Sequence, residues 1–391
     1  MVSSKEDWQK IIIGNDTTLK ARIGWQGLTT NEYRDSGEYY LVTGTDFENG
    51  LVNWDSCHFV DKYRYVQDKN IQLKVDDILV TKDGTIGKVG FVETIRLPST
   101  LNSGVFVVRS NSDKLYAKYL YYIFVSKIFD DFLNKLTAGS TISHLYQKDF
   151  LHFSFDAPPL QEQKAIAKAL SDTDALLTSM QKLITKKESI KKATMQQLLT
   201  GKKRLSGFSG EWEEKRLGDF LDYQQPSKYL VTSTKYTENG NIPVLTAGKT
   251  FILGYTSEEH GIFFNLPTII FDDFTTAMKF VKFPFKAKSS AMKMLIPKND
   301  KVNLKFVFEI MSQIQYLVGD HKRHWIAEFS NLKILVPPST QEQKAIAQIL
   351  SDMDNEIEAL NKKLYKLKYI KDGMMSELLT GKIRLKGVNN D

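Results

Sequence analysis

The chain has 391 residues, of which 42% are hydrophobic and 25% are charged, and these ordinary globular values argue against wholesale disorder. It shows no apolar signal core and no run of about 18 apolar residues, which argues against a membrane protein. The single Cys57 excludes an internal disulfide and a thiolate metal site, so we expect a cytoplasmic location. The net charge of +7 is concentrated in residues 161–205, which hold 10 Lys and Arg against 4 Asp and Glu.

Residues 1–156 are long enough to form a domain with its own core. Their charges nearly balance, at 18 Lys and Arg against 20 Asp and Glu. Short apolar runs such as Ile78-Leu79-Val80, bounded by Gly, Asp and Thr, predict buried strands. We therefore predict a first domain of the α+β class over this segment.

Residues 157–205 show the pattern of one long helix. Pro158 and Pro159 end the strand before it, and Gly201 suits a C-terminal cap. Apolar residues recur at steps of three and four, which predicts a heptad stripe along one face. The stripe consists of Ile166, Leu170, Leu177, Met180, Ile184 and Leu198, with Thr173, Lys187, Lys191 and Thr194 as polar interruptions.

Residues 206–336 faintly repeat the first domain. The run Thr268-Ile269-Ile270-Phe271 predicts a buried strand. In spacing, Ile269–Lys279 matches Ile78–Lys88, and Ser290–Phe306 matches Ser103–Tyr119. We predict a second α+β domain that is related to the first.

Residues 337–391 repeat the long helix. Gln341–Ala347 is identical to Gln161–Ala167 at an offset of 180 residues, and about half of the positions in 341–385 match 161–205 without a gap. Ser339 and Glu342 can form a capping box at its start. The second stripe consists of Ile346, Leu350, Met353, Ile357, Leu360, Leu364, Leu367, Met374 and Leu378, with Lys371 as its interruption.

A helix of about 40 residues is roughly 60 Å long and cannot bury such a stripe by itself. Two equivalent helices in one chain can bury both stripes against each other. We therefore predict two α+β domains separated by two long antiparallel coiled-coil helices, with a pseudo-two-fold internal repeat. An intermolecular coiled coil is the alternative.

Several short motifs invite an enzymatic interpretation but lack a required residue. Pro243–Thr250 ends like a P-loop but has Pro243 in place of the first glycine, and Gly84–Val89 has neither the spacing nor the hydroxyl. Glu162-Gln163-Lys164 has the Glu-x-Lys order of many nuclease sites, yet it opens a helix and occurs twice, which favours a capping and surface role. The histidines lack metal-ligand spacing, and no methyltransferase motif occurs. We predict no catalytic residue, no metal and no cofactor on this chain.

The repeated motifs resemble those of one known family. Ala157–Ala167 and Gly210–Gly218, together with the doubled Leu-Leu-Thr-Gly-Lys helix ends, are typical of the specificity subunits of type I restriction-modification systems. Asp77–Gly87 and Ile270–Ala277 resemble the target recognition domains of that family. The resemblance covers nearly the whole chain.

The resemblance implies a non-catalytic subunit with two target recognition domains held apart by an antiparallel helix pair. Each domain would read one half of a bipartite site in double-stranded DNA. The helices would dock two methyltransferase subunits, through which restriction subunits join the complex. S-adenosylmethionine, ATP and Mg would belong to these partners.

DNA sequence is read at base edges by polar and cationic side chains, while cations on phosphates set the register. We predict such contacts from the loops of both domains, although a solvated turn or a satisfied hydroxyl is the alternative for any single residue. The predicted contacts are Thr43, Thr45, Lys82, Thr85, Lys88, Ser140, Thr141 and His144 in the first domain, and Thr246, Lys249, Thr275, Thr276, Lys279, Lys322, Arg323 and His324 in the second.

Two other functions stay open at this point. A dimeric coiled-coil interaction protein could bind nucleic acid nonspecifically through the basic helix 161–205, but this leaves the divergence of the globular domains beside similar helices unexplained. A specificity module could also work with a methyltransferase alone, without restriction.

Overall fold

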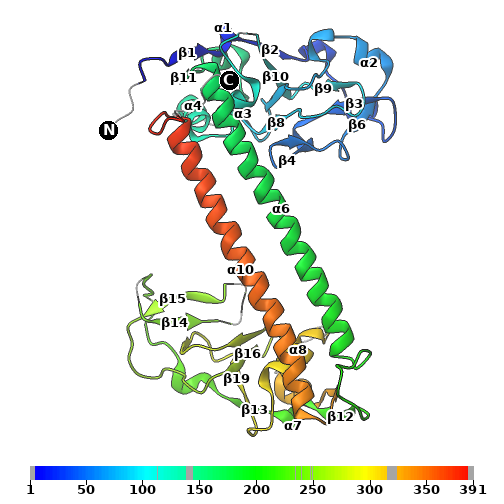
Figure 1. The fold of residues 1–391 in the computed structure, drawn as a ribbon, viewed down its shortest axis with the longest axis vertical. Coiled ribbons are helices and arrows are strands. Elements are labelled where there is room, and N and C mark those ends of the chain that lie inside the picture. Colours follow the sequence, from blue (N-terminus) through cyan, green and yellow to red (C-terminus); the bar gives the residue numbers. More distant parts are fainter. Residues whose placement is uncertain are drawn as a thin grey trace. The chain divides into compact units, whose positions relative to one another are not determined.

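The structure is a computed structural model that describes residues 5–111, 113–137, 144–233, 235–238, 240–246, 248, 250–314 and 324–385, with the backbone alone at 137, 324 and 327. The chain divides into two compact units, residues 1–180 with 363–391 and residues 181–362. Each unit contains one globular domain and parts of both long helices (Figure 1).

The two long helices are α6 (Leu160–Leu198) and α10 (Thr340–Leu378), each of 39 residues. Ala, Leu, Lys, Gln and Glu fill them and proline is absent inside them, as helix propensity favours. Beyond their ends, Gly201 and Gly381 adopt φ values of +70° and +72°, a left-handed conformation that suits a glycine after a helix.

The predicted apolar stripes are the inner faces of these helices. Every residue of both stripes is buried or half-buried, including Ile184 and Leu364 near the middle of each helix. In the first unit the start of α6 lies beside the end of α10, where Thr173 contacts Met374. In the second unit the end of α6 lies beside the start of α10, so the helices pair in antiparallel fashion in both.

The charged interruptions of the stripes form ion pairs between the helices. Lys371 lies 2.6 Å from Asp174 in the first unit, and Lys187 lies 2.6 Å from Glu356 in the second. Lys191 pairs with Asp354, which repeats the Lys371–Asp174 pair at the 180-residue offset. The lysine alkyl chains can cover the seam while their ammonium groups meet carboxylates at its margin.

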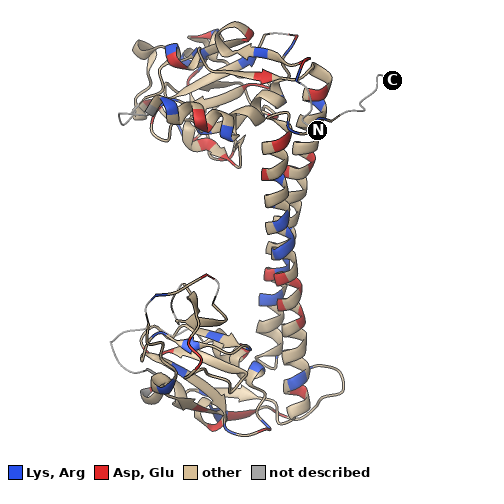
Figure 2. Ribbon diagram, turned by 90° about the vertical axis from the view of Figure 1, so that its left-hand side faces the viewer, with Lys and Arg blue, Asp and Glu red and all other residues tan. Residues whose placement is uncertain are grey.

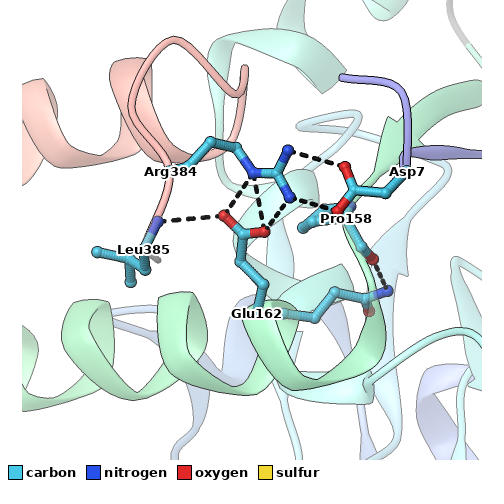
Figure 3. A network of polar contacts seen from close by, with 6 residues as sticks. Asp7, Pro158, Glu162, Arg384 and Leu385 are labelled. Atoms are coloured by element: carbon cyan, nitrogen blue, oxygen red, sulfur yellow. Dashed lines mark hydrogen bonds and ion pairs between the residues drawn. The ribbon is translucent and has the colours of Figure 1, made fainter. Parts of the chain in front are cut away.

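An arginine near the chain end holds two carboxylates of the first unit (Figure 3). The Arg384 guanidinium donates to Asp7 at 2.7 and 2.8 Å and to Glu162 at 2.6 and 2.9 Å, and the N–H of Leu385 donates to Glu162 at 3.2 Å. The Arg384 side chain is 7% exposed and that of Glu162 is 10% exposed. The hydrogen bonds to the two carboxylates raise the pKa of Arg384, so the group stays charged.

The second unit repeats this contact at the same offset. Arg204 donates twice to Glu342 at 2.7 Å, and Glu342 is fully buried. The N–H of Glu342 donates to the Ser339 hydroxyl at 3.3 Å, which provides half of the predicted capping box. The surface role predicted for the Glu-x-Lys motif is therefore wrong for both glutamates, because each packs inside and holds an arginine from the end of the opposite helix.

The first domain contains three β-sheets, together with short helices and 3-10 turns. A six-stranded sheet has the order β2-β10-β7-β8-β5-β4, a three-stranded sheet has the order β6-β3-β9, and β1 pairs with β11. The strands are β1 (Gln9–Ile12), β2 (Thr17–Ala21), β3 (Tyr39–Val42), β4 (Phe47–Glu48), β5 (Leu51–Val52), β6 (His58–Val60), β7 (Ile78–Thr81), β8 (Val89–Phe91), β9 (Ser99–Leu101), β10 (Val105–Ser110) and β11 (Ser154–Ala157). The helices are α1 (Ile13–Asp16), α2 (Lys62–Val66), α3 (Ala117–Phe124), α4 (Lys127–Thr137) and α5 (Gln147–Phe150), with 3-10 turns η1 (Gly24–Gln26), η2 (Thr30–Glu32), η3 (Gly44–Asp46) and η4 (Lys69–Ile71).

The second domain has the same plan in a smaller form. A four-stranded sheet has the order β13-β19-β16-β17, a three-stranded sheet has the order β15-β14-β18, and β12 pairs with β20. The strands are β12 (Glu213–Arg216), β13 (Leu221–Gln224), β14 (Ile242–Leu245), β15 (Ile252–Thr256), β16 (Thr268–Asp272), β17 (Met278–Val281), β18 (Lys286–Ala287), β19 (Met292–Pro297) and β20 (Lys333–Val336). The helices are α7 (Leu217–Phe220), α8 (Leu304–Gln313) and α9 (His324–Ala327), with 3-10 turns η5 (Pro226–Tyr229) and η6 (Phe329–Asn331).

The predicted α+β class is confirmed, and the predicted strands 78–80 and 268–271 lie within β7 and β16. The core of each domain extends onto both long helices. The first core includes Ile166 and Leu378, and the second includes Leu198 and Ile346. Each domain is therefore packed directly against the helix pair rather than tethered to it.

The lone cysteine lies inside the first domain. Cys57 is buried, and burial raises the pKa of its thiol to about 12. A thiol with so high a pKa carries almost no thiolate at neutral pH, so the side chain serves as a small apolar group.

Replacing Arg384 with alanine should destabilise the protein by about 2 kcal/mol, because the buried Glu162 carboxylate then loses its charged donor. The midpoint of urea unfolding, followed by tryptophan fluorescence, measures this change. Arg96→Ala is the matched control, since Arg96 is 53% exposed and pairs with an exposed Asp55. That variant should change stability by less than about 1 kcal/mol. Equal losses in the two variants would contradict a special role for the buried contact.

Candidate nucleic-acid interface

The hairpin between β7 and β8 carries one group of predicted contact residues in the first domain. The Thr81 hydroxyl accepts a hydrogen bond from the Lys88 N–H at 2.9 Å and also donates to the Thr85 carbonyl, and the Gly87 N–H donates to the Thr81 carbonyl at 2.9 Å. Gly87 has a φ of +79°, and a Cβ there would lie 2.3 Å from Leu133 of α4. A residue with a Cβ is therefore disfavoured at this position.

The turn at Thr43–Asp46 lies against this hairpin. Lys88 donates its ammonium to the Gly44 carbonyl at 3.0 Å, and a Cβ on Gly44 would lie 2.5 Å from the Thr81 side chain. The Thr43 N–H and hydroxyl both donate to the Asp46 carboxylate, at 2.7 and 2.9 Å. Thr43 and Lys88 therefore hold the turn in place, whereas Thr45 is exposed.

Two further segments complete this surface. The Leu145 N–H donates to the Lys82 carbonyl at 2.8 Å, and His144 contacts the Asp83 carboxylate through Nδ1. The Lys82 N–H in turn donates to the Gly104 carbonyl at 2.9 Å. Hydrogen bonds thus join the turn, the hairpin, the β9–β10 connection and the segment at His144.

The predicted residues of this surface differ in exposure. Thr85 is exposed, His144 is half-buried, and the Lys82 ammonium lies 5.4 Å from the centre of the Phe106 ring. Ser140 and Thr141 lie outside the described residues. Thr45, Thr85, Lys82 and His144 are therefore the predicted side chains best placed to meet a ligand at this surface.

The second domain has a shorter hairpin between β16 and β17. The Asp272 carboxylate accepts the N–H groups of Phe274 and Thr275 at 2.9 and 2.8 Å. Thr276 adopts a φ of +59°, an unusual conformation for a branched residue. Thr275 at the tip is exposed and Thr276 is half-buried, and Lys279 on β17 is exposed.

A buried ion pair that no sequence pattern predicted anchors this hairpin. Asp273 and Lys293 are each 2% exposed, with 3.4 Å between carboxylate and ammonium. Lys293 also donates to Gln225 at 3.1 Å, and the Trp325 N–H donates to Asp273 at 3.0 Å. Lys293 occupies the register position of Phe106 in the first domain, so no shared motif revealed the pair.

The remaining predicted residues of the second domain are only partly described. Thr246 is half-buried, and its hydroxyl accepts the Gly248 N–H at 3.1 Å. Lys249, Lys322 and Arg323 lie outside the described residues, and His324 is described by its backbone alone. Their predicted contacts stay predictions.

The chemistry available at both surfaces is hydrogen bonding and charge. Lys and Arg are interspersed with Asp and Glu on both domains and along the helices (Figure 2), so neither surface is a simple basic patch. Within the described ranges, no cluster of three or more His, Cys, Asp or Glu could hold a metal ion. Among the described helices, no segment combines the length and the apolar character that a membrane span needs.

Comparison with known families finds two matches within the chain. A family model described as a type I restriction modification DNA specificity domain matches residues 25–192 and again residues 209–369. The first match covers the first domain from residue 25 onward, the second covers the whole second domain, and each includes most of the long helix that follows.

Individual relatives support the same grouping. The specificity subunit of the type I restriction enzyme EcoR124I/EcoR124II from Escherichia coli is 50% identical over 150 residues, 37% of either chain. The MjaVIII specificity subunit from Methanocaldococcus jannaschii is 26% identical over 98% of this chain and 95% of that one. The crystal structure of the type I restriction-modification S subunit from M. genitalium shares the fold, with a TM-score of 0.66 and 18% identity over 97% of both chains.

Gly87→Ala should destabilise the first domain more than Gly84→Ala. Both glycines have positive φ, at +79° and +68°, so either alanine costs about 1 kcal/mol of backbone strain. The two sites differ because a Cβ at Gly84 meets open space, whereas one at Gly87 overlaps Leu133. Thermal unfolding of the two variants measures the difference. An equal shift of both midpoints would contradict the packing of the hairpin on α4.

Proposed function

The chain belongs to the type I restriction-modification DNA specificity family, and we propose that it is the non-catalytic subunit that reads a bipartite site in double-stranded DNA. Each domain reads one half-site, and the base pairs between the half-sites are not read. The long helices dock two methyltransferase subunits, and restriction subunits join the complex through them.

The observation that carries this proposal is the gathering of loops in each domain. Hydrogen bonds bring the β7–β8 hairpin, the turn at Thr45 and the segment at His144 together in one domain, and they bring the β16–β17 hairpin against Trp325 in the other. The exposed side chains of these loops include the hydroxyls of Thr45, Thr85 and Thr275. Lys279 adds an exposed ammonium on β17, and such groups suit base edges and phosphates. The loops of the two domains differ in sequence, which suits the reading of two different half-sites.

The chemistry of modification and cleavage belongs to partner subunits in this proposal. The chain has no methyl-donor loop and no complete P-loop: Pro243–Thr250 has Pro243 at the first glycine position, and Gly84–Val89 lacks the spacing and the hydroxyl. S-adenosylmethionine is held by the methyltransferase subunits, and ATP and Mg act on the restriction subunits.

Exposed apolar residues on the helices support the docking of partners. Leu176, Leu183 and Ile190 recur every seven residues along α6 and are 51%, 40% and 42% exposed. Tyr365 and Tyr369, one turn apart on α10, are 76% and 75% exposed. Large apolar side chains left in water on a surface helix mark an interaction surface, and a methyltransferase subunit is the partner that we propose for it.

Exchanging residues 1–156 for the corresponding domain of a relative should change one half of the recognised sequence and leave the other half and the spacer unchanged. The reason is that each domain has its own core and its own group of loops. Selection of bound duplexes from a library with randomised bases, using the chain together with its methyltransferase, measures both half-sites.

Two results of that selection would overturn the proposal. A simultaneous change in both half-sites would show that the domains do not read independently. Equal binding of all duplexes by the parent chain would favour the nonspecific coiled-coil protein instead.

Leu183→Lys and Leu364→Lys should have opposite effects on docking and on stability. Leu183 is 40% exposed, and its counterpart in α10 is Lys363, so the fold should tolerate this lysine while methyltransferase affinity falls at least about fivefold. Leu364 is 7% exposed, so a lysine there should cost about 3 kcal/mol or more of stability.

Thermal unfolding and co-purification with the methyltransferase separate these effects. Base preference should be unchanged in the folded fraction of either variant. Full methyltransferase binding by Leu183→Lys would remove this α6 stripe from the docking surface. A shifted base preference in Leu364→Lys would contradict the division between reading loops and supporting helices.

A further inference from the structure

We propose that the turns joining β9 to β10 and β18 to β19 each carry a residue that determines base preference, Asn102 in the first domain and Lys288 in the second. The inference rests on the proposed function, because it requires that these domains read DNA. It adds to each domain one turn whose residues are not among the DNA contacts predicted from the sequence.

The two positions are equivalent by backbone geometry. β9 pairs in parallel with β3, with Leu101 opposite Val42, and β18 pairs in parallel with β14, with Ala287 opposite Leu245. In each domain the N–H of the residue that follows the strand continues this parallel hydrogen-bond ladder. Asn102 donates to the Val42 carbonyl at 2.9 Å, and Lys288 donates to the Leu245 carbonyl at 2.9 Å.

Both turns also end on the reading hairpin of their domain. The Gly104 carbonyl accepts the Lys82 N–H at 2.9 Å, and the Ala291 carbonyl accepts the Asp273 N–H at 3.1 Å. In the first domain the turn therefore lies between Lys82 and the end of β3, which leads into Thr43. In the second domain the turn lies between Asp273 and the end of β14, which leads into Thr246. A side chain on the turn is placed among groups already expected to meet DNA.

Asn102 presents an oriented set of hydrogen-bonding groups. Its carbonyl oxygen accepts from the N–H of Ser103, and from the Ser103 hydroxyl at 3.1 Å, while its amide nitrogen donates to the Tyr33 hydroxyl. Asn102 and Tyr33 are half-buried, and burial raises the pKa of Tyr33. The phenol thus keeps its proton at neutral pH and can donate it to an acceptor on a base edge.

Lys288 occupies the same position with a different chemistry. It is half-buried, and its ammonium lies 5.6 Å from the centre of the Tyr236 ring. A tyrosine from the segment before β14 thus accompanies the turn, as Tyr33 from the segment before β3 accompanies Asn102. The first domain offers neutral donors here and the second offers a cation, which favour different patterns of acceptors in the groove.

Ionised glutamates hold both tyrosine-bearing segments. Glu32, next to Tyr33, accepts the Thr29 N–H at 2.9 Å and an Arg64 hydrogen bond at 2.7 Å. Glu258 accepts the N–H groups of Thr232 and Ser233 at 3.0 Å each and the Lys286 ammonium at 2.5 Å, and Lys286 lowers the pKa of Glu258 to about 2. These hydrogen bonds fix the residue next to Tyr33 in the first domain and Thr232 and Ser233 in the second, and fixed neighbours favour direct reading over adaptive fitting.

The first test uses Asn102→Asp and Tyr33→Phe in the full chain with its methyltransferase. Asn102→Asp keeps the oxygen that accepts from Ser103 but replaces the amide donor, and Tyr33→Phe removes only the hydroxyl. Selection from a library with randomised half-sites should show both variants changed at the same base pair of the first half-site, by about tenfold in preference. The second half-site should be unchanged.

The matched control is Asn111→Asp, which introduces the same charge just beyond the opposite end of β10. It should leave both half-sites unchanged. In the second domain, Lys288→Met should relax one base pair of the second half-site, and its control Lys298→Met, just beyond the far end of β19, should relax none. Thermal unfolding midpoints within a few degrees of the parent establish that each variant is folded.

Two outcomes overturn the inference without touching the proposed function. One is an unchanged base preference in Asn102→Asp, Tyr33→Phe and Lys288→Met while the parent chain selects a bipartite site. The other is uniform weakening on all sequences with a smaller salt dependence, which marks a phosphate contact. A parent chain that selects no bipartite sequence overturns the proposed function, and this inference with it.

Discussion

A helix of 39 residues with a single apolar stripe requires a partner along its length, and this chain supplies that partner itself. The contact that closes the pairing at each end is a buried glutamate held by an arginine. Glu162 and Glu342 lie at helix starts, and Arg384 and Arg204 reach them from the ends of the opposite helices. A buried carboxylate is very costly without its cation, so the ends cannot separate cheaply. The start of one helix and the end of the other are thereby joined within each unit.

The domains depend on this pairing because their cores include helix residues. Leu170 and Leu378 belong to the core of the first domain, and Leu198 and Leu350 to that of the second. A sheet whose core is completed by a rigid helix holds its loop ends in fixed positions. The candidate reading loops therefore begin and end at fixed strand ends.

Backbone hydrogen bonds at equivalent positions help to place the loops in both domains, which explains how two domains with little sequence in common keep one plan. The Gly104 and Ala291 carbonyls accept equivalent N–H groups although the donors belong to Lys82 and Asp273. Side chains on such a scaffold can change without moving it. Phe106 in one domain is replaced by Lys293 in the other, and the residue whose side chain lies next to it changes from Lys82 to Asp273. Different base preferences can arise in this way on a constant frame.

The sequence by itself determined the elements that depend on local pattern. Heptad spacing predicted both long helices and their inner faces, and the 180-residue repeat predicted two related halves. Short apolar runs bounded by glycine, aspartate and threonine predicted strands that lie within β7 and β16. Tertiary structure decided the pairings between distant residues. Glu162 was expected on the surface because its partner Arg384 lies 222 residues away. The position of Asn102 beside the hairpin could not be predicted, because its turn meets the hairpin only through the β3–β9 and β7–β10 pairings. Periodicity is a property of neighbouring residues, whereas the burial of a charge or the position of a turn depends on which surfaces meet after folding.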